Sequence, residues 1–233
     1  MVDETTKEIA KAVTESAKTS GKAIDAAKQL GEFADNVFGS ILKDSVGLFA
    51  DRLAYFRWER AFLLRDRVEK KLKDRGIDTT RAVPVNIGLP LIEKASVEEN
   101  DDLHTLWSNL LANALDPSYR NEIRRSFVTI LAELEPIDAA LLDRIFKFVN
   151  AGQRSPMNTP VDTWRLFDGM NDDREVLLAS LQNLFRLGLV ESGTEGNVQP
   201  QVPEISIIGP RPPEIHGVFI TALGNSFQKA ISA

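Results

Sequence analysis

The most informative stretch of the chain runs from Leu89 to Pro117 and reads LPLIEKASVEENDDLHTLWSNLLANALDP. Its large apolar residues recur at three- and four-residue steps, the period of an amphipathic helix; they are Leu103, Leu106, Trp107, Leu110, Leu111 and Ala114. Ser96 and Glu99 have the spacing of a capping box, and Asp116-Pro117 is typical of a helix end. The stretch therefore predicts a buried helix with recognisable boundaries.

Acidic residues crowd the beginning of that helix. Residues 93–102 hold five acids and one lysine. Carboxylates are favourable at the positive end of a helix dipole, so we interpret them as helix-start electrostatics and not as a metal site. Farther along, Asn109 and Asn113 lie four residues apart on the flank of the apolar stripe. We expect them to cap a helix or to form hydrogen bonds across to a neighbouring helix.

Residues 136–233 are predicted to hold three helices, a strand, a long loop, a second strand and a final helix. Pro136 is typical of a helix start, Gly188 of a helix stop and Thr221 of a helix cap. The strands are expected at 189–192 and 218–220. This order resembles a winged helix, as does the pairing of LFRLGLV (184–190) with ITALG (220–224). The region carries more acidic than basic residues, which favours protein contacts over DNA.

Upstream, residues 49–75 predict one long helix that ends at Gly76. Between residues 52 and 75 there are nine basic and four acidic residues. Two interpretations stay open: a solvated face with pairs such as Arg65–Glu69, which we prefer, or a patch for an anionic lipid or nucleic acid. The candidate residues for such a patch are Arg52, Arg57, Arg60, Arg65, Arg67, Lys70 and Lys71.

The segment before that helix is apolar and interrupted by glycines at 21, 31, 39 and 47. It is either a core helix packed closely on its neighbours, which we prefer, or an amphipathic segment that leaves the core for a membrane interface. Its candidate membrane or assembly face consists of Phe33, Val37, Phe38, Ile41, Leu42 and Phe49.

Several functional classes find no support in the 233 residues. The chain has no Cys, so thiol chemistry is excluded, and its two histidines, His104 and His216, are far apart. His104 is expected on the surface or flank of its helix. No phosphate-binding, dinucleotide-binding, zinc-protease or nucleophile-elbow motif occurs. We therefore predict a protein that is not an enzyme, with no metal, cofactor or small-molecule substrate.

Neither a secretory signal nor an uninterrupted apolar run of about 18 residues is present. These features predict a cytoplasmic protein, either free or attached to the inner face of the membrane.

The central region resembles one known family. LPLIEKASVEENDDLHTLWSNLLANALDP, followed by SFVTILAELEPIDAALLDRI at residues 126–145, is similar to the Abi-alpha family of bacterial abortive-infection proteins. The resemblance extends over most of the chain from about residue 20. It implies a role in resistance to phage, and it supplies neither a catalytic mechanism nor site residues.

Together these features predict a mainly α protein. Residues 1–80 would form an N-terminal helical region, 81–135 a central helical region, and 136–233 a winged-helix-like domain with a small β-hairpin. We expect a non-enzymatic phage-defence protein that acts through protein contacts or self-association, with N-terminal helices that act on membranes. The alternatives are a winged-helix regulator that binds nucleic acid, or a structural adaptor that oligomerises through its long helix.

Overall fold

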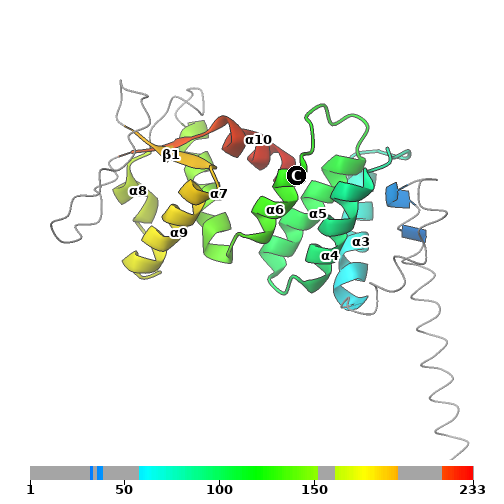
Figure 1. The fold of residues 1–233 in the computed structure, drawn as a ribbon, viewed down its shortest axis with the longest axis horizontal. Coiled ribbons are helices and arrows are strands. Elements are labelled where there is room, and N and C mark those ends of the chain that lie inside the picture. Colours follow the sequence, from blue (N-terminus) through cyan, green and yellow to red (C-terminus); the bar gives the residue numbers. More distant parts are fainter. Residues whose placement is uncertain (1–31, 34–35, 39–57, 152–160, 194–216, 233) are drawn as a thin grey trace, which may run out of the picture. The chain divides into compact units, whose positions relative to one another are not determined.

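The computed structural model describes residues 32–33, 36–38, 58–151, 161–193 and 217–232. The protein is mainly helical and has a small two-stranded antiparallel hairpin, as predicted (Figure 1). Its contacts gather into two compact units: Met1–Glu99 with Ala114–Tyr119, and Asn100–Asn113 with Arg120–Ala233. The division into three regions taken from the sequence stays a prediction.

The first unit is built on two helices that contact each other, α3 (Trp58–Asp74) and α4 (Val85–Val97) (Figure 1). The buried side chains of α3 recur at three- and four-residue steps and are Ala61, Leu64, Val68 and Leu72. The predicted stop at Gly76 is confirmed. This glycine has a φ of 69°, and two backbone bonds of 2.9 Å, Gly76 N–H to Lys73 and Ile77 N–H to Leu72, close the helix end. Residues 49–57 lie outside the described part.

The predicted capping box at Ser96 is wrong. Ser96 belongs to α4, and its hydroxyl donates to the Glu93 carbonyl at 2.8 Å. The next helix, α5 (Asp101–Leu115), is capped by Asn100, whose side-chain oxygen accepts the N–H groups of Asp102 and Leu103 at 3.0 Å each. Asn is as good an N-cap as Ser, and here it directly precedes the two acids of the first turn.

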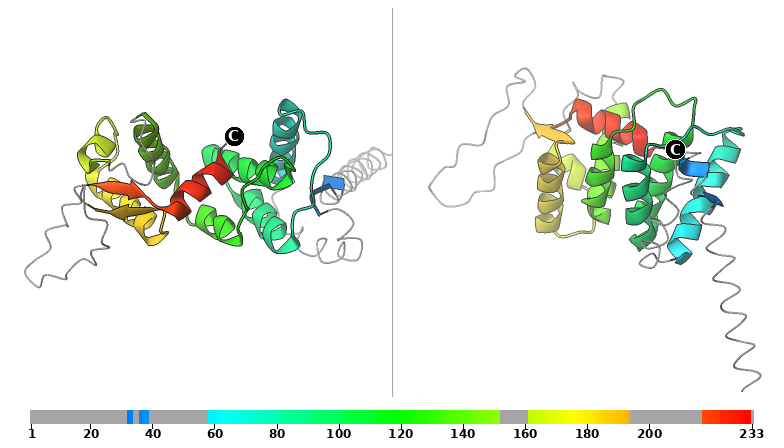
Figure 2. Two further views of the ribbon diagram at one scale, coloured as in Figure 1. Left: turned by 90° about the horizontal axis from the view of Figure 1, so that it is seen from above. Right: turned by 45° about the vertical axis from the view of Figure 1, so that its right-hand side comes forward.

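The second unit contains the remaining helices and the hairpin. In chain order these are α6 (Arg125–Ala132), α7 (Pro136–Ala151), α8 (Thr163–Phe167), α9 (Arg174–Arg186), β1 (Val190–Ser192), β2 (Val218–Ile220) and α10 (Ala222–Ile231). Helix α7 contacts α9 (Figure 1), and β2 leads directly into α10 (Figure 2). In the hairpin Val190 pairs with Ile220 and Ser192 pairs with Val218. The predicted start at Pro136 and both predicted strands are confirmed.

The two motifs paired in the sequence analysis, residues 184–190 and 220–224, lie next to each other where α9, β1 and α10 meet. Gly188, with a φ of 69°, ends α9. The Thr221 hydroxyl donates to the Gly188 carbonyl at 2.6 Å and accepts the Gly224 N–H at 2.9 Å, so Thr221 caps α10 as predicted. The pairing of the two short sequence motifs therefore reflects direct hydrogen bonds between them.

Helix α5 also holds the last turn of α10. The Asn109 side chain donates to the Ile231 carbonyl at 2.7 Å. The Asn113 side chain donates to the carbonyls of Ala230 and Ser232 at 2.8 and 3.0 Å. This confirms the expectation that the two asparagines bond across to another helix. They satisfy carbonyls that a helix end leaves without intrahelical partners.

Candidate functional site

The basic residues of α3 form the first candidate site. The α3 basic surface, as defined here, consists of Arg60, Arg65, Arg67, Lys70 and Lys71. Lys70 is exposed and the other four are half-buried. The remaining predicted members, Arg52 and Arg57, lie outside the described residues. All five share a helix whose apolar side is buried, so their charged ends are left to the solvent side.

Two arginines of this surface make local contacts. The Arg65 guanidinium donates to the Asp66 carboxylate at 2.8 and 3.0 Å and lies 5.0 Å from the centre of the Phe62 ring. Arg60 donates to the backbone carbonyl of Glu99. The Asp66 carboxylate therefore partly balances the charge of Arg65.

Positive charge is more concentrated around Lys71. Partial burial lowers the pKa of the Lys71 ammonium, and the charges of Arg75, Arg67 and Lys70 lower this pKa further, against a smaller opposing effect of Asp74. A bound anion would offset the electrostatic repulsion between these neighbouring cations. Positive charge is therefore most concentrated toward the C-terminal end of the α3 basic surface.

The second candidate feature is the N-terminal segment, defined here as residues 32–33 and 36–38. Its described apolar residues are buried: Phe33 is 5% exposed, and Val37 and Phe38 are 0% exposed. The Val37 carbonyl accepts the Val83 N–H at 2.8 Å. A Cβ atom on Gly88 would lie 2.6 Å from a ring carbon of Phe38, so this glycine makes room for the ring.

These contacts place three of the six residues of the proposed membrane or assembly face in the core of the first unit. To act at a membrane or in assembly, they would have to leave that position. Ile41, Leu42 and Phe49 lie outside the described residues.

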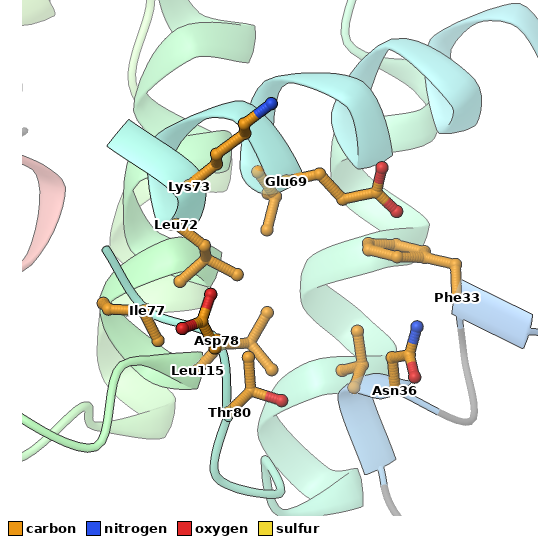
Figure 3. A pocket seen from close by; sticks show the side chains of 11 residues that line it. Phe33, Asn36, Glu69, Leu72, Lys73, Ile77, Asp78, Thr80 and Leu115 are labelled. Carbon is orange, nitrogen blue, oxygen red and sulfur yellow. The ribbon is translucent and has the colours of Figure 1, made fainter. Parts of the chain in front are cut away.

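A cavity of about 280 Å³ lies between the N-terminal segment and α3 (Figure 3). Apolar side chains form about half of its lining and come from Phe33, Val37, Val68, Leu72, Ile77 and Leu115. Polar side chains also line it, from Asn36, Glu69, Lys73, Asp78 and Thr80. The packing between the segment and α3 is therefore incomplete.

The end of α5 carries a buried carboxylate beside this region. The Asp116 side chain accepts the N–H and hydroxyl of Ser118 at 2.7 and 2.6 Å, and Arg75 lies 3.4 Å away. Burial raises the pKa of Asp116, but the Ser118 hydrogen bonds, the Arg75 charge and the Tyr119 N–H outweigh it and leave the pKa below its usual value. Asp-Pro-Ser signals the turn in the sequence, whereas the ion pair to Arg75 has no sequence signal.

In the second unit, α9 presents few basic groups to solvent. Its exposed residues are Arg174, Glu175, Val176, Ala179, Gln182 and Arg186. Arg186 forms an ion pair with Glu133 at 2.7 Å and donates to the Asn183 side chain at 2.7 and 3.0 Å. Arg174 and Glu175 balance each other in charge, so this face offers little attraction to phosphate groups.

Comparison with known protein families now adds a decisive observation. The family model described as "Abortive infection alpha" matches residues 59–231, from the beginning of α3 to the end of α10. The chain belongs to the abortive infection alpha family. This confirms the family resemblance found in the sequence and associates the protein with abortive-infection defence. Comparisons with curated proteins and with solved structures give no match.

The match to the abortive infection alpha family covers the α3 basic surface. It also covers helices α3 and α4, which pack beside the N-terminal segment. The segment itself, residues 32–33 and 36–38, precedes the matched range. Sequence reasoning had named the segment and the basic residues. It missed the cavity between the segment and α3, because that space depends on side chains distant in the sequence.

One histidine expectation is wrong in this family member. His104 is 0% exposed, not a surface residue, because α5 is covered over a wide arc that includes Leu103 and Trp107 as well. His216 lies outside the described residues. Among the residues that the structure describes, no His, Asp and Glu side chains gather in a group that could hold a metal ion. None of the helices in this described part combines the length and apolar character that crossing a membrane requires.

Proposed function

We propose that this protein is a non-enzymatic component of phage defence that acts by binding, with its N-terminal segment as the effector. The observation that carries the proposal is the position of the segment: Phe33, Val37 and Phe38 are buried in the first unit, beside a cavity that separates the segment from α3. Family membership supports the defence role. Release of these contacts would expose Phe33, Val37 and Phe38, which are suited to a membrane interface or to another protein.

The α3 basic surface supports a membrane as the anionic partner. It belongs to the same unit as the segment, and Lys71 experiences repulsion from Arg67, Lys70 and Arg75. Each basic residue near an anionic bilayer contributes about 1 kcal/mol to binding. In this proposal the α3 basic surface makes the lipid contact, and the N-terminal segment of the same unit is the effector.

Flotation of the full-length protein with vesicles tests this proposal. We expect flotation with vesicles rich in phosphatidylserine and much less with neutral phosphatidylcholine vesicles, and a fall with rising salt. Lys70→Gln with Lys71→Gln should weaken binding roughly tenfold or more. The control Lys147→Gln with Lys229→Gln removes the same charge from exposed positions of the second unit and should leave flotation unchanged. Equal flotation of both double variants would contradict the role of α3.

Release of the segment is tested in bacteria challenged with phage. Phe38→Ala removes a fully buried ring from the segment and should raise the population in which the segment is released. If the segment is the effector, cells that produce this variant should grow poorly even without phage. A folded Phe38→Ala protein that gives normal growth and normal protection would overturn the effector role.

The alternative function, a winged-helix regulator that binds nucleic acid, is favoured by one observation. Val218 pairs with Ser192 of β1 on one side and forms backbone bonds of 2.9 and 3.0 Å with Val161 on the other. The order α7, bridging residue 161, α8, α9, β1, β2 is therefore consistent with a winged helix. The face of α9 provides little positive charge for DNA. A DNA affinity that falls steeply with salt and is lost in Arg174→Gln would support this alternative.

A further inference from the structure

The cavity between the N-terminal segment and α3 has the features of a small-ligand site. Its apolar walls include Val37, Val68, Leu72 and Leu115, each less than 9% exposed, so an apolar group packed against them would be partly removed from water. Its volume of about 280 Å³ is slightly below that of typical ligand pockets, about 300–1,000 Å³. A small organic molecule would fit this space, whereas a nucleotide or a whole lipid would not.

The charge at the cavity indicates what kind of molecule this would be. Glu69 and Asp78 line it, and neither carboxylate has an ion-pair or hydrogen-bond partner among the described residues. In Figure 3 the Glu69 side chain extends toward the Phe33 ring, while the Lys73 ammonium points away from the hollow. A cation held there would be attracted by the Glu69 carboxylate and by the face of the Phe33 ring. The arrangement therefore favours a positively charged head group over a negatively charged one.

We propose that this cavity binds a small organic cation with an apolar body, and that its occupancy holds the N-terminal segment in place. Phe33 and Val37 form one wall and Val68 and Leu72 form another, so undocking of the segment would dismantle the site. A ligand that binds only the intact site stabilises the docked state by mass action. The regulatory part of this inference rests on the proposed function of the segment, whereas the binding site does not.

Three probes of similar length separate the effect of the head-group charge from that of the apolar chain. They are n-pentylammonium, neutral n-pentanol and n-pentanoate, each titrated into the full-length protein and followed by NMR. The ammonium should bind several-fold more tightly than pentanol, and pentanoate should bind most weakly. Glu69→Gln with Asp78→Asn should abolish the advantage of the ammonium while leaving pentanol binding unchanged. Thr80→Leu, which fills part of the cavity from a half-buried position, should weaken binding of all three probes.

Hydrogen exchange of one amide measures how ligand binding is coupled to docking of the N-terminal segment. The Val83 N–H is bonded to the Val37 carbonyl, so its exchange reports undocking of the segment. At a ligand concentration ten times Kd, exchange of this amide should slow about tenfold, because the docked state alone binds. The Thr221 amide, bonded to Leu189 in the second unit, serves as the control and should not change.

Each outcome bears on the inference. Absence of probe binding, or pentanoate binding as tight as that of the ammonium, would overturn the ligand assignment. Binding without any slowing of Val83 exchange would overturn the coupling to the segment. Because none of these measurements involves phage or lipid, they can fail while the proposed function stands. Conversely, probe binding with the expected slowing would persist if the vesicle and phage tests failed.

Discussion

The backbone of Gly224 in α10 lies so close to Leu189 that a Cβ atom on the glycine would come within 2.0 Å of the Leu189 carbonyl oxygen. Real Cβ atoms do not approach a backbone oxygen this closely, so no residue but glycine fits without a backbone shift. Thr221, which bonds to both Gly188 and Leu189, holds the two backbones at this separation.

Gly224→Ala should therefore destabilise the protein by about 3 kcal/mol or more, since overpacking against backbone cannot be relieved by a rotamer change. Gly76→Ala provides the comparison. Gly76 has a φ of 69° but open space around it, so only backbone strain of about 1 kcal/mol is expected. Urea unfolding of both variants gives the two free energies. Similar losses in the two variants would contradict the steric explanation.

A second prediction concerns the carboxamides that hold the end of α10. Asn113→Ala removes two hydrogen bonds to backbone carbonyls and should cost about 2 kcal/mol, whereas Asn109→Ala removes one and should cost about 1 kcal/mol. Asn113→Asp is the sharper variant, because a carboxylate accepts but cannot donate and would face two carbonyl oxygens. It should be more destabilising than Asn113→Ala in thermal unfolding at pH 7. The opposite order would mean that Asn113 acts through its size alone.

Much of this fold could be predicted from the sequence where a local rule governs the outcome. Pro136 begins α7, Gly76 and Gly188 end helices, and Thr221 caps α10, because each of these residues acts within one turn of itself. Ser96 shows the limit of the method. Ser96 and Asn100 both fit a capping role in the sequence. Because α4 extends to Val97, Ser96 lies inside that helix and Asn100 caps the next one.

The candidate site depends more on contacts between distant residues. The apolar period identified Phe33, Val37 and Phe38 as one group, but it could not show that Val83 and Gly88 receive them. The burial of His104 was missed for the same reason. A helix covered on most of its circumference buries residues outside its apolar stripe, and the pattern of α5 alone does not show how much of the helix is covered.

A third prediction compares a buried hydrogen bond of Asn183 with an exposed ion pair of the neighbouring Arg186. The Asn183 side chain donates to the buried Asp138 carboxylate at 2.7 Å and to the Glu133 carbonyl at 3.0 Å. Asn183→Ala should cost about 2 kcal/mol because it leaves a buried carboxylate short of a donor. The Arg186–Glu133 ion pair is largely exposed, so Arg186→Ala should cost less than about 1 kcal/mol. Chemical denaturation ranks the two, and an equal cost would indicate that Arg186 orients Asn183.

A fourth prediction tests the packing of the Phe38 ring against Gly88. Gly88→Ala places a methyl group against this ring and should cost about 2 kcal/mol. Phe38→Leu shortens the side chain and should make room for that methyl group. The double variant should therefore lose at least about 1 kcal/mol less than the sum of the two single variants. Additive costs would show that the methyl group clashes with something other than Phe38.

The last prediction concerns the acid stability that Asp116 provides. Its pKa in the folded protein lies below the ordinary value of 3.8. The folded state therefore binds this proton more weakly than the unfolded state does. The stabilisation is complete above about pH 5 and is lost as the pH falls through the folded pKa. Asp116→Asn keeps the shape and removes the charge, and should cost about 1–2 kcal/mol at pH 7.

The pH dependence distinguishes this charge effect from simple disruption of the turn. Free energies of unfolding measured from pH 7 to pH 2 should converge for the natural protein and Asp116→Asn, because protonated Asp116 no longer attracts Arg75 at 3.4 Å. Asp143→Asn, which removes an exposed pair with Lys147, is the matched control and should change stability little at any pH. A gap between the natural protein and Asp116→Asn that stays constant down to pH 2 would assign the loss to the Ser118 hydrogen bonds, which an amide oxygen accepts less strongly than a carboxylate.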